Sequence, residues 1–192
     1  MRLRLPMFLF FISSLYAGTI SGQNPVRFVA ESIVFRYDAP WFSVNGIYCF
    51  LSRKHKSVSQ GITFPFPCRS AEIDTLAIFD MDQGLAVPFE RKDSAIHFTL
   101  RVSANDTLRL NIFYRQRIHG AVMKYILTTT RHWGEPLQKA VYRFEATGLR
   151  EDPLFSYPPD RHIGNEHRRV FFWNLHHFMP DRDFLITLPL SN

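Results

Sequence analysis

Short motifs that carry a known chemistry are missing from this 192-residue sequence. It contains no G-x-S-x-G turn for a serine nucleophile, no G-x-x-x-x-G-K-[ST] phosphate loop and no H-E-x-x-H zinc motif. Cysteine is scarce, and its two copies do not form the C-x-x-C pair of redox catalysts. The sequence therefore gives no positive argument for an enzyme, and we expect neither a cofactor nor a metal site.

Long apolar runs are also rare, and the clearest is MFLFFISSLYAG at positions 7–18. Two arginines precede it and small residues follow it, which is the layout of a secretory signal peptide. The run is too short to cross a bilayer as a helix. We therefore expect a signal peptide at residues 1–22 and a single exported domain at 23–192, periplasmic, secreted or on the cell surface, and not an integral membrane protein. A buried N-terminal helix or a signal anchor is the alternative.

Charge of one sign is not concentrated anywhere along the chain. The formal net charge is +6 at pH 7, and acidic residues are interspersed with basic ones. The densest basic stretch, Arg53–Lys56, lies between two apolar runs and is typical of a solvated turn. Because nucleic-acid binding needs a concentrated basic face, we expect no nucleic-acid partner.

The two cysteines, Cys49 and Cys68, are an even number in a chain that we expect to be exported. This favours a structural disulfide that closes a loop of about 20 residues and stabilises the fold by roughly 3 kcal/mol. Two reduced cysteines on neighbouring strands are the alternative.

Apolar and polar residues alternate along most of the chain, and this period of two is typical of antiparallel strands with one buried face. Turn residues separate the strands at short intervals, and no helical period is found. The pattern predicts an all-β, antiparallel β-sandwich of about eight or nine strands. Asn45-Gly46, inside an apolar run, indicates a β-bulge. Strands are expected at 26–37, 44–51, 76–81, 96–102, 107–114, 122–130, 140–146, 170–177 and 183–188.

The segment Leu149–Arg169 breaks this pattern with three prolines and no period, so we expect one long loop there. Loops of this length are commonly functional or disordered. The strand that follows, VFFWNLHHF, has apolar residues at both parities, which suits either a strand buried on both faces or one that meets another molecule. The candidate binding residues of this region are His162, His167, Phe171, Trp173, His176 and His177.

These histidines match no metal-site spacing, and His176 and His177 point to opposite faces of a strand. We therefore expect them to hold no metal ion.

In the stretch KYILTTTRHWGEPLQKAVYRFE, Trp133, Gly134 and Pro136 stand where the chain must reverse direction. We interpret them as a structural corner between two strands, with Trp133 capping the sandwich. Asn105-Asp106-Thr107 fits a glycosylation sequon in a turn, which matters only in a eukaryotic source.

Three stretches taken together resemble a group of uncharacterised exported bacterial β-sandwich proteins, a domain of unknown function. They are VNGIYCFLSRK…ITFPFPC, YRQRIHGAVMKYILTTTRHWGEPLQKAVYRFE and NLHHFMPDRDFLITL. The resemblance implies an exported sandwich and carries no catalytic residues. The sequence departs from the group at Leu51-Ser52-Arg53, where a polar residue is expected. The matching positions are Tyr48, Phe50, Phe64 to Pro67, Tyr125, Thr129, Trp133, Pro136 and Pro180.

Our leading hypothesis is an exported, non-enzymatic protein that binds a protein or cell-envelope partner through Leu149–Arg169 and the aromatic strand after it. A hydrolase or carbohydrate-active enzyme with a His/Asp site near 162–183 is the alternative, and it requires those side chains to converge. A carbohydrate-binding module is a further alternative, which requires exposed, coplanar aromatics. Core positions for Trp133 and Trp173 would count against that module.

Overall fold

The computed structural model describes residues 24–165 and 167–189. The segment expected to be a signal peptide lies outside the described residues. Within the described part no helix is long and apolar enough to cross a membrane.

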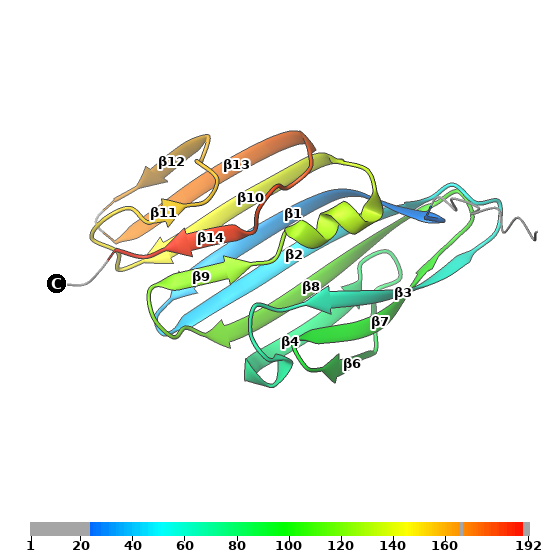
Figure 1. Cartoon of the computed structure of the whole chain (residues 1–192), viewed down its shortest axis with the longest axis horizontal. Coiled ribbons are helices and arrows are strands. Elements are labelled where there is room, and N and C mark those ends of the chain that lie inside the picture. The colour runs from blue at the N-terminus through cyan, green and yellow to red at the C-terminus, as the bar shows by residue number, and fades with distance from the viewer. Residues whose placement is uncertain (1–23, 166, 190–192) are drawn as a thin grey trace, which may run out of the picture.

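An eight-stranded sheet forms the back of the molecule (Figure 1). Neighbouring strands pair antiparallel except β1 and β10, which are parallel and align Ala30 with Lys139. In spatial order the strands are β12 (Arg161–Gly164), β13 (Arg168–Phe178), β10 (Leu137–Thr147), β1 (Val26–Asp38), β2 (Trp41–Ser52), β8 (Thr107–Arg117), β4 (Ile73–Asp80) and β5 (Leu85–Ala86).

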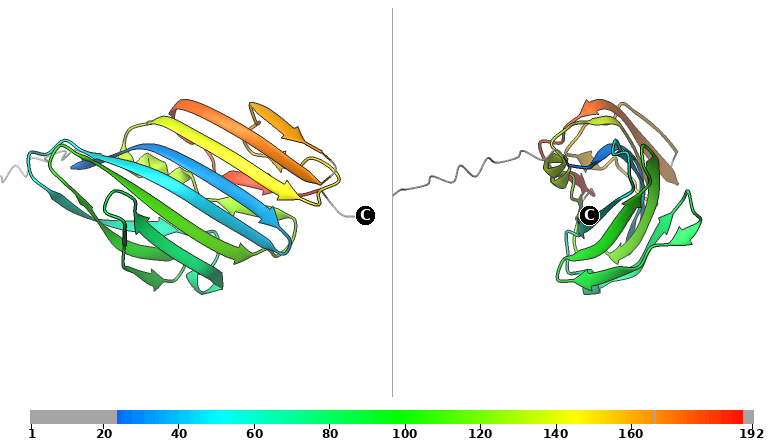
Figure 2. Two further views of the ribbon diagram at one scale, coloured as in Figure 1. Left: turned by 180° about the vertical axis from the view of Figure 1, so that it is seen from behind. Right: turned by 90° about the vertical axis from the view of Figure 1, so that its right-hand side faces the viewer.

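Two three-stranded sheets cover the inner face of this large sheet, which curls around them (Figure 2). The first consists of β11 (Leu154–Phe155), β14 (Phe184–Thr187) and β9 (Val122–Tyr125). The second consists of β3 (Val58–Pro65), β7 (Ala95–Val102) and β6 (Phe89–Lys92). Two short 3-10 helices, η1 (Ser70–Glu72) and η2 (Thr128–Trp133), complete the described elements.

The all-β sandwich predicted from the alternation is confirmed, with fourteen strands in the described part of the chain rather than eight or nine. The segment Leu149–Arg169 is not one continuous loop, because it contributes the short strands β11 and β12. The strand expected at 122–130 ends at Tyr125, and its threonines form η2 instead. The reason is a tertiary contact: Asp183 Oδ1 accepts hydrogen bonds from the backbone N–H of Leu127 and Thr128.

Aromatic side chains fill the core between the large sheet and the sheet β11-β14-β9. Phe184 of β14 stacks on Phe35 of β1 at 5.0 Å between ring centroids and meets Trp173 of β13 edge-to-face at 5.1 Å. Each buried aromatic of this size stabilises the fold by about 2–3 kcal/mol through the apolar surface that it removes from water. The core therefore holds the first small sheet firmly on the large one.

A register shift in β1 lies between Phe28 and Ala30, where β1 pairs with β2. The extra residue changes the parity of the strand, so Phe28 and Glu31 both point to the inner face. The bulge expected at Asn45-Gly46 is not formed, because β2 pairs without interruption there on both sides. A Cβ on Gly46 would lie 2.4 Å from the hydroxyl oxygen of Tyr48, so the glycine makes room for that ring.

The predicted disulfide between Cys49 and Cys68 is wrong, since both cysteines are free. Cys49 lies opposite Arg109 of β8, whereas the Cys68 thiol contacts the side chain of Gln116 at 3.4 Å. Arg109 and Gln116 are seven positions apart on one strand, about 23 Å at the usual strand rise. That separation is far beyond the reach of a disulfide.

Candidate functional site

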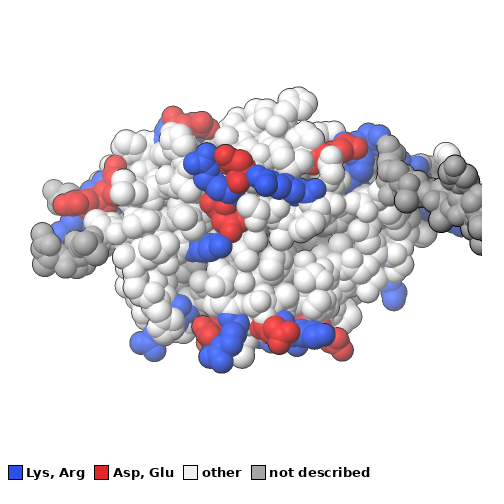
Figure 3. Space-filling model, viewed as in Figure 1, with Lys and Arg blue, Asp and Glu red and all other residues white. Residues whose placement is uncertain are grey.

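A cleft of about 420 Å³ opens between the two small sheets, and we call it the central cleft. One wall comes from β3, and the opposite wall from η2 and the end of β9. Its floor is the inner face of β1, β2 and β8. Figure 3 shows the surface between the small sheets as an uncharged hollow. The gap exists because the two small sheets pack on the large sheet without pairing with each other.

Aromatic rings make up much of the lining. Trp133 lies against Phe28 at 5.9 Å and Phe50 at 5.4 Å between ring centroids, and Phe28 stacks on Phe50 at 5.2 Å. From the opposite wall Phe64 meets Tyr48 edge-to-face at 5.8 Å. Flat apolar surfaces on both walls suit a flat apolar molecule, because such rings bury a large area with little loss of side-chain freedom.

The polar group in the floor is Glu31, which is 4% exposed. Its Oε1 accepts a hydrogen bond of 2.5 Å from the hydroxyl of Tyr142. Burial raises the pKa of Glu31 to about 7, and the Tyr142 hydrogen bond only partly opposes this. The carboxyl group is therefore largely protonated below neutral pH, and it ionises near pH 7.

Two tyrosines, Tyr48 in the floor and Tyr125 at the end of β9, add polar groups to the cleft. The hydroxyl groups of Tyr48 and Tyr125 are 2.8 Å apart and hydrogen-bond each other. Burial raises the pKa of both phenols, so both stay neutral at physiological pH. Gln60, on the β3 wall, has a buried Oε1 with no hydrogen-bond partner among the described residues. The cleft thus offers hydrogen-bond acceptors to an incoming donor.

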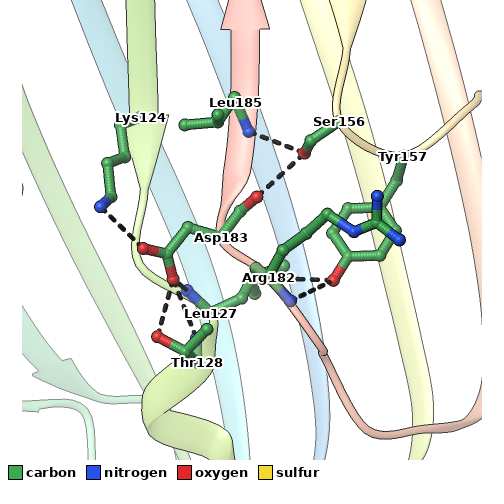
Figure 4. Close-up of polar contacts among 8 residues, drawn as sticks. All are labelled: Lys124, Leu127, Thr128, Ser156, Tyr157, Arg182, Asp183 and Leu185. Atoms are coloured by element: carbon green, nitrogen blue, oxygen red, sulfur yellow. Dashed lines mark hydrogen bonds and ion pairs between the residues drawn. The ribbon is translucent and has the colours of Figure 1, made fainter.

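The rim above the cleft is fixed by polar contacts around Asp183 (Figure 4). Asp183 Oδ1 accepts hydrogen bonds from the N–H groups of Leu127 and Thr128 and from the Thr128 hydroxyl, and its Oδ2 pairs with Lys124 at 2.8 Å. Burial raises the pKa of Asp183, but the bonds from Lys124 and Thr128 outweigh it and leave the pKa below its ordinary value. The start of η2, and with it Trp133, is held in place by a residue 55 positions away.

A larger and more open cavity, of about 860 Å³, is lined by residues of β3, β7, β6 and β8 and by the segment between β5 and β6. It shares part of the β3 and β7 lining with the central cleft. It is lined in part by exposed residues such as Leu85 and Glu90. Thr63 and His97 hydrogen-bond each other there at 3.0 Å. Its buried acidic residue, Asp80, is engaged by its own turn, because its Oδ1 accepts hydrogen bonds from the backbone N–H groups of Asp82 and Gln83. Neither tryptophan nor tyrosine lines this cavity among the described residues, so the central cleft is the stronger candidate site.

The candidate binding residues from the sequence do not meet at one place. Phe171 and Trp173 are buried, and the indole N–H of Trp173 donates to the backbone oxygen of Tyr157 at 3.0 Å. His162 is exposed and packs on Phe171. The remaining candidates, His167, His176 and His177, are exposed.

The His/Asp site required by the hydrolase hypothesis is not assembled. Asp181 forms an ion pair with Arg182 and accepts a hydrogen bond from the Tyr157 hydroxyl. Asp183 forms an ion pair with Lys124 and accepts hydrogen bonds at the start of η2. Within residues 24–165 and 167–189 no three His, Cys, Asp or Glu side chains are grouped so that they could hold a metal ion. The burial of Trp173 likewise removes it from any sugar-stacking surface.

Trp133, Gly134 and Pro136 do form a corner, although it joins a 3-10 helix to a strand rather than two strands. Gly134 ends η2 with φ of 77°, a left-handed conformation that favours glycine. Trp133 is half-buried and packs on the core, and it also lines the central cleft. The corner therefore has a structural role and contributes a wall of the candidate site.

Sequence reasoning missed Glu31. Strict alternation from Phe28 places Ala30 and Ser32 inward, whereas alternation counted back from Phe35 places Ile33 and Glu31 inward. The two alternations within FVAESIVF disagree about which residues point inward, and such a disagreement indicates a β-bulge between them. The acidic side chain between two apolar runs was then the residue to examine.

Fold and cleft together define a β-sandwich with a ligand-sized internal cleft. No family model matches the sequence, and no curated protein matches it. Among solved structures, a candidate nutrient binding protein from Legionella pneumophila superposes with a TM-score of 0.65 and 14% identity over 86% of this chain and 67% of that one. An M1 zinc metallopeptidase from Deinococcus radiodurans superposes with a TM-score of 0.55 and 10% identity over 86% of this chain and 43% of the peptidase. At these identities the likeness shows the fold alone.

Proposed function

We propose that this chain is an exported binding protein that acts without catalysis, and that its central cleft holds a small, largely apolar ligand. The observation that carries the proposal is the cleft of about 420 Å³ with aromatic walls and one buried carboxyl group in its floor. Apolar pockets with a few convergent polar groups are typical of ligand sites. A solved structure of the same fold is described as a candidate nutrient binding protein, which supports a binding role.

A fluorescence titration with N-phenyl-1-naphthylamine, a neutral apolar dye that brightens in apolar surroundings, tests this use of the cleft. We expect saturable binding to the wild type and at least a tenfold loss in Trp133→Ala, which removes one wall. Trp41→Ala is the matched control, because Trp41 lies under Arg115 and outside the cleft. Equal binding by wild type and Trp133→Ala, or no binding at all, would overturn the proposal.

Export is the second part of the proposal, and the arginines followed by the apolar run at 7–18 support it. The resemblance to exported bacterial β-sandwich proteins supports it as well. Expression of the full chain in a bacterium with an outer membrane is expected to yield a periplasmic product that begins shortly after Gly22. Mass spectrometry of the intact protein reads the new N-terminus directly. An uncleaved product in the cytoplasm contradicts export.

A protein or envelope partner at the segment Leu149–Arg169 remains part of the proposal, because Leu154 and Ile163 are 74% and 55% exposed there. Deletion of 152–166 is a poor test, since Phe155 packs on Phe171 and Trp173 in the core. The double variant Leu154→Ser/Ile163→Ser leaves that packing intact. Pull-down from envelope extracts is expected to lose a partner with this variant, and an unchanged set of partners contradicts the contact.

A further inference from the structure

The carboxyl group of Glu31 has no basic partner, unlike many acidic side chains of this protein. Within the described residues, ion pairs engage eight other carboxylates, and none of them involves Glu31. Its Oε1 is occupied by Tyr142, while Oε2 receives no hydrogen bond from the described residues. A buried acid without a cation is costly to the fold, and such groups concentrate at functional sites.

The lining of the cleft disfavours an anionic ligand. Among the residues that the structure describes, neither lysine nor arginine lines it, although the chain has 23 of these residues. Besides Glu31, its titratable lining groups are Tyr48, Tyr125 and His132, and the two tyrosines stay neutral. An anionic ligand would meet a carboxyl group with no compensating charge, so the electrostatics favour a cation or a neutral donor.

The aromatic walls add a second attraction for a cation. Phe28, Tyr48 and Trp133 line the same cleft as Glu31, and the ring of Phe28 lies within 6.1 Å of the other two rings, measured between centroids. An ammonium group near such faces is attracted by their negative quadrupoles, an effect that grows when water is excluded. Gln60 Oε1, which is buried and has no partner in the described residues, supplies a further acceptor for an N–H donor.

We propose that the central cleft selects apolar molecules that carry a cationic amine, with Glu31 as the counter-ion in the floor. This inference rests on the proposed function of the cleft as a ligand site. In the empty cleft the acid is largely protonated at pH 6.5, because burial raises its pKa to about 7. An arriving ammonium stabilises the carboxylate, so the proton of Glu31 leaves to solvent when the amine binds.

The groups that face Glu31 come from three strands: Tyr142 from β10, Tyr48 from β2 and Tyr125 from β9. All three stay neutral near pH 7, because burial raises their pKa values. The proton released on binding is therefore that of Glu31. His132, which is exposed at the edge of the cleft, is the remaining titratable lining group, and His132→Asn controls for it.

Isothermal titration with tryptamine and with tryptophol, in which a neutral hydroxyl group replaces the amine, tests the selectivity. We expect wild type to bind tryptamine at least tenfold more tightly than tryptophol at pH 8, and Glu31→Gln to bind both alike. At pH 6.5, titrations in two buffers of different ionisation enthalpy are expected to show release of up to about 0.8 proton with tryptamine and none with tryptophol. His132→Asn is expected to retain both results.

The outcomes separate the two proposals. Equal affinity of wild type for tryptamine and tryptophol overturns amine selection but leaves the cleft as an apolar binding site. Tenfold selectivity that persists in Glu31→Gln assigns the preference to another residue and also overturns the inference. Failure of both probes and of the neutral dye overturns the binding function itself.

Discussion

Two regions on the inner face of the large sheet are both rich in aromatic residues, but one is a packed core and the other is an open cleft. Under the sheet β11-β14-β9 the rings of Phe35, Trp173 and Phe184 are fully buried and pack against one another. Beside it, Phe28 and Trp133 leave a cleft of about 420 Å³. The difference lies in what covers the large sheet. Phe184 reaches down from a covering strand in the first region, whereas the second lies between two covering sheets that do not pair.

The largest effect is expected in the filled region, from Trp173→Ala. Removing a fully buried indole leaves a cavity and costs about 4 kcal/mol of the free energy of unfolding. Urea denaturation followed by circular dichroism measures this loss. A loss below about 1 kcal/mol would show that Trp173 contributes no more to the free energy of unfolding than the residues that line the cleft do.

Glu31→Gln is expected to act in the opposite direction, because the floor of the cleft carries an acid that is unfavourable when ionised. The folded state holds the proton of Glu31 more tightly than the unfolded state does, so the wild type loses stability as pH rises from about 4.5 to about 7. The variant lacks this loss. We expect it to be more stable than wild type by roughly 3 kcal/mol at pH 8 and nearly equal at pH 4, as measured by urea denaturation.

Asp183→Asn tests the boundary between the two regions. The variant loses the ion pair with Lys124 and weakens the bonds to the start of η2, which costs about 2 kcal/mol at pH 7. Since the pKa of Asp183 is lowered in the folded state, its contribution is present above the ordinary carboxyl pKa and is lost as pH falls through the folded value. Thermal unfolding curves of variant and wild type are therefore expected to converge in acid. A constant difference at all pH values would contradict the role of the charge.

Trp133→Ala is expected to have the smallest effect on stability, about 1 kcal/mol, because the ring is half-buried beside an open cleft. The same urea titration used for Trp173→Ala gives the comparison directly. Equal losses for the two tryptophans would show that Trp133 belongs to the core and not to the wall of a site.

The alternation of residues predicts the strands that lie on a buried face without irregularity. In the strand expected at 96–102, the alternation puts Ile96, Phe98, Leu100 and Val102 on one face, and all four are buried. The strand β3 escaped prediction because Gly61 and Pro65 are weak strand formers, and its pairing with β7 is a long-range contact.

The candidate site was not predictable to the same degree. The three threonines before Arg131 favour a strand by propensity, yet Asp183 holds the start of that segment in a 3-10 helix. The disulfide was predicted from the even number of cysteines alone, and that number says nothing of how far apart Cys49 and Cys68 lie along β8. Glu31 reaches the cleft only through a one-residue bulge, which shifts parity without changing composition.

The parallel pair β1–β10 has a consequence for how the chain reaches this structure. Ala30 and Lys139 are neighbours in the sheet although 109 positions separate them in the chain. A chain that emerges N-terminus first can close the β1–β2 hairpin early, yet the other edge of β1 has no strand to pair with until β10 has emerged. Exposed edges of this kind recruit other chains, and pairing over such separations is slow. Assembly of the cleft floor therefore depends on protecting that edge until β10 has been synthesised.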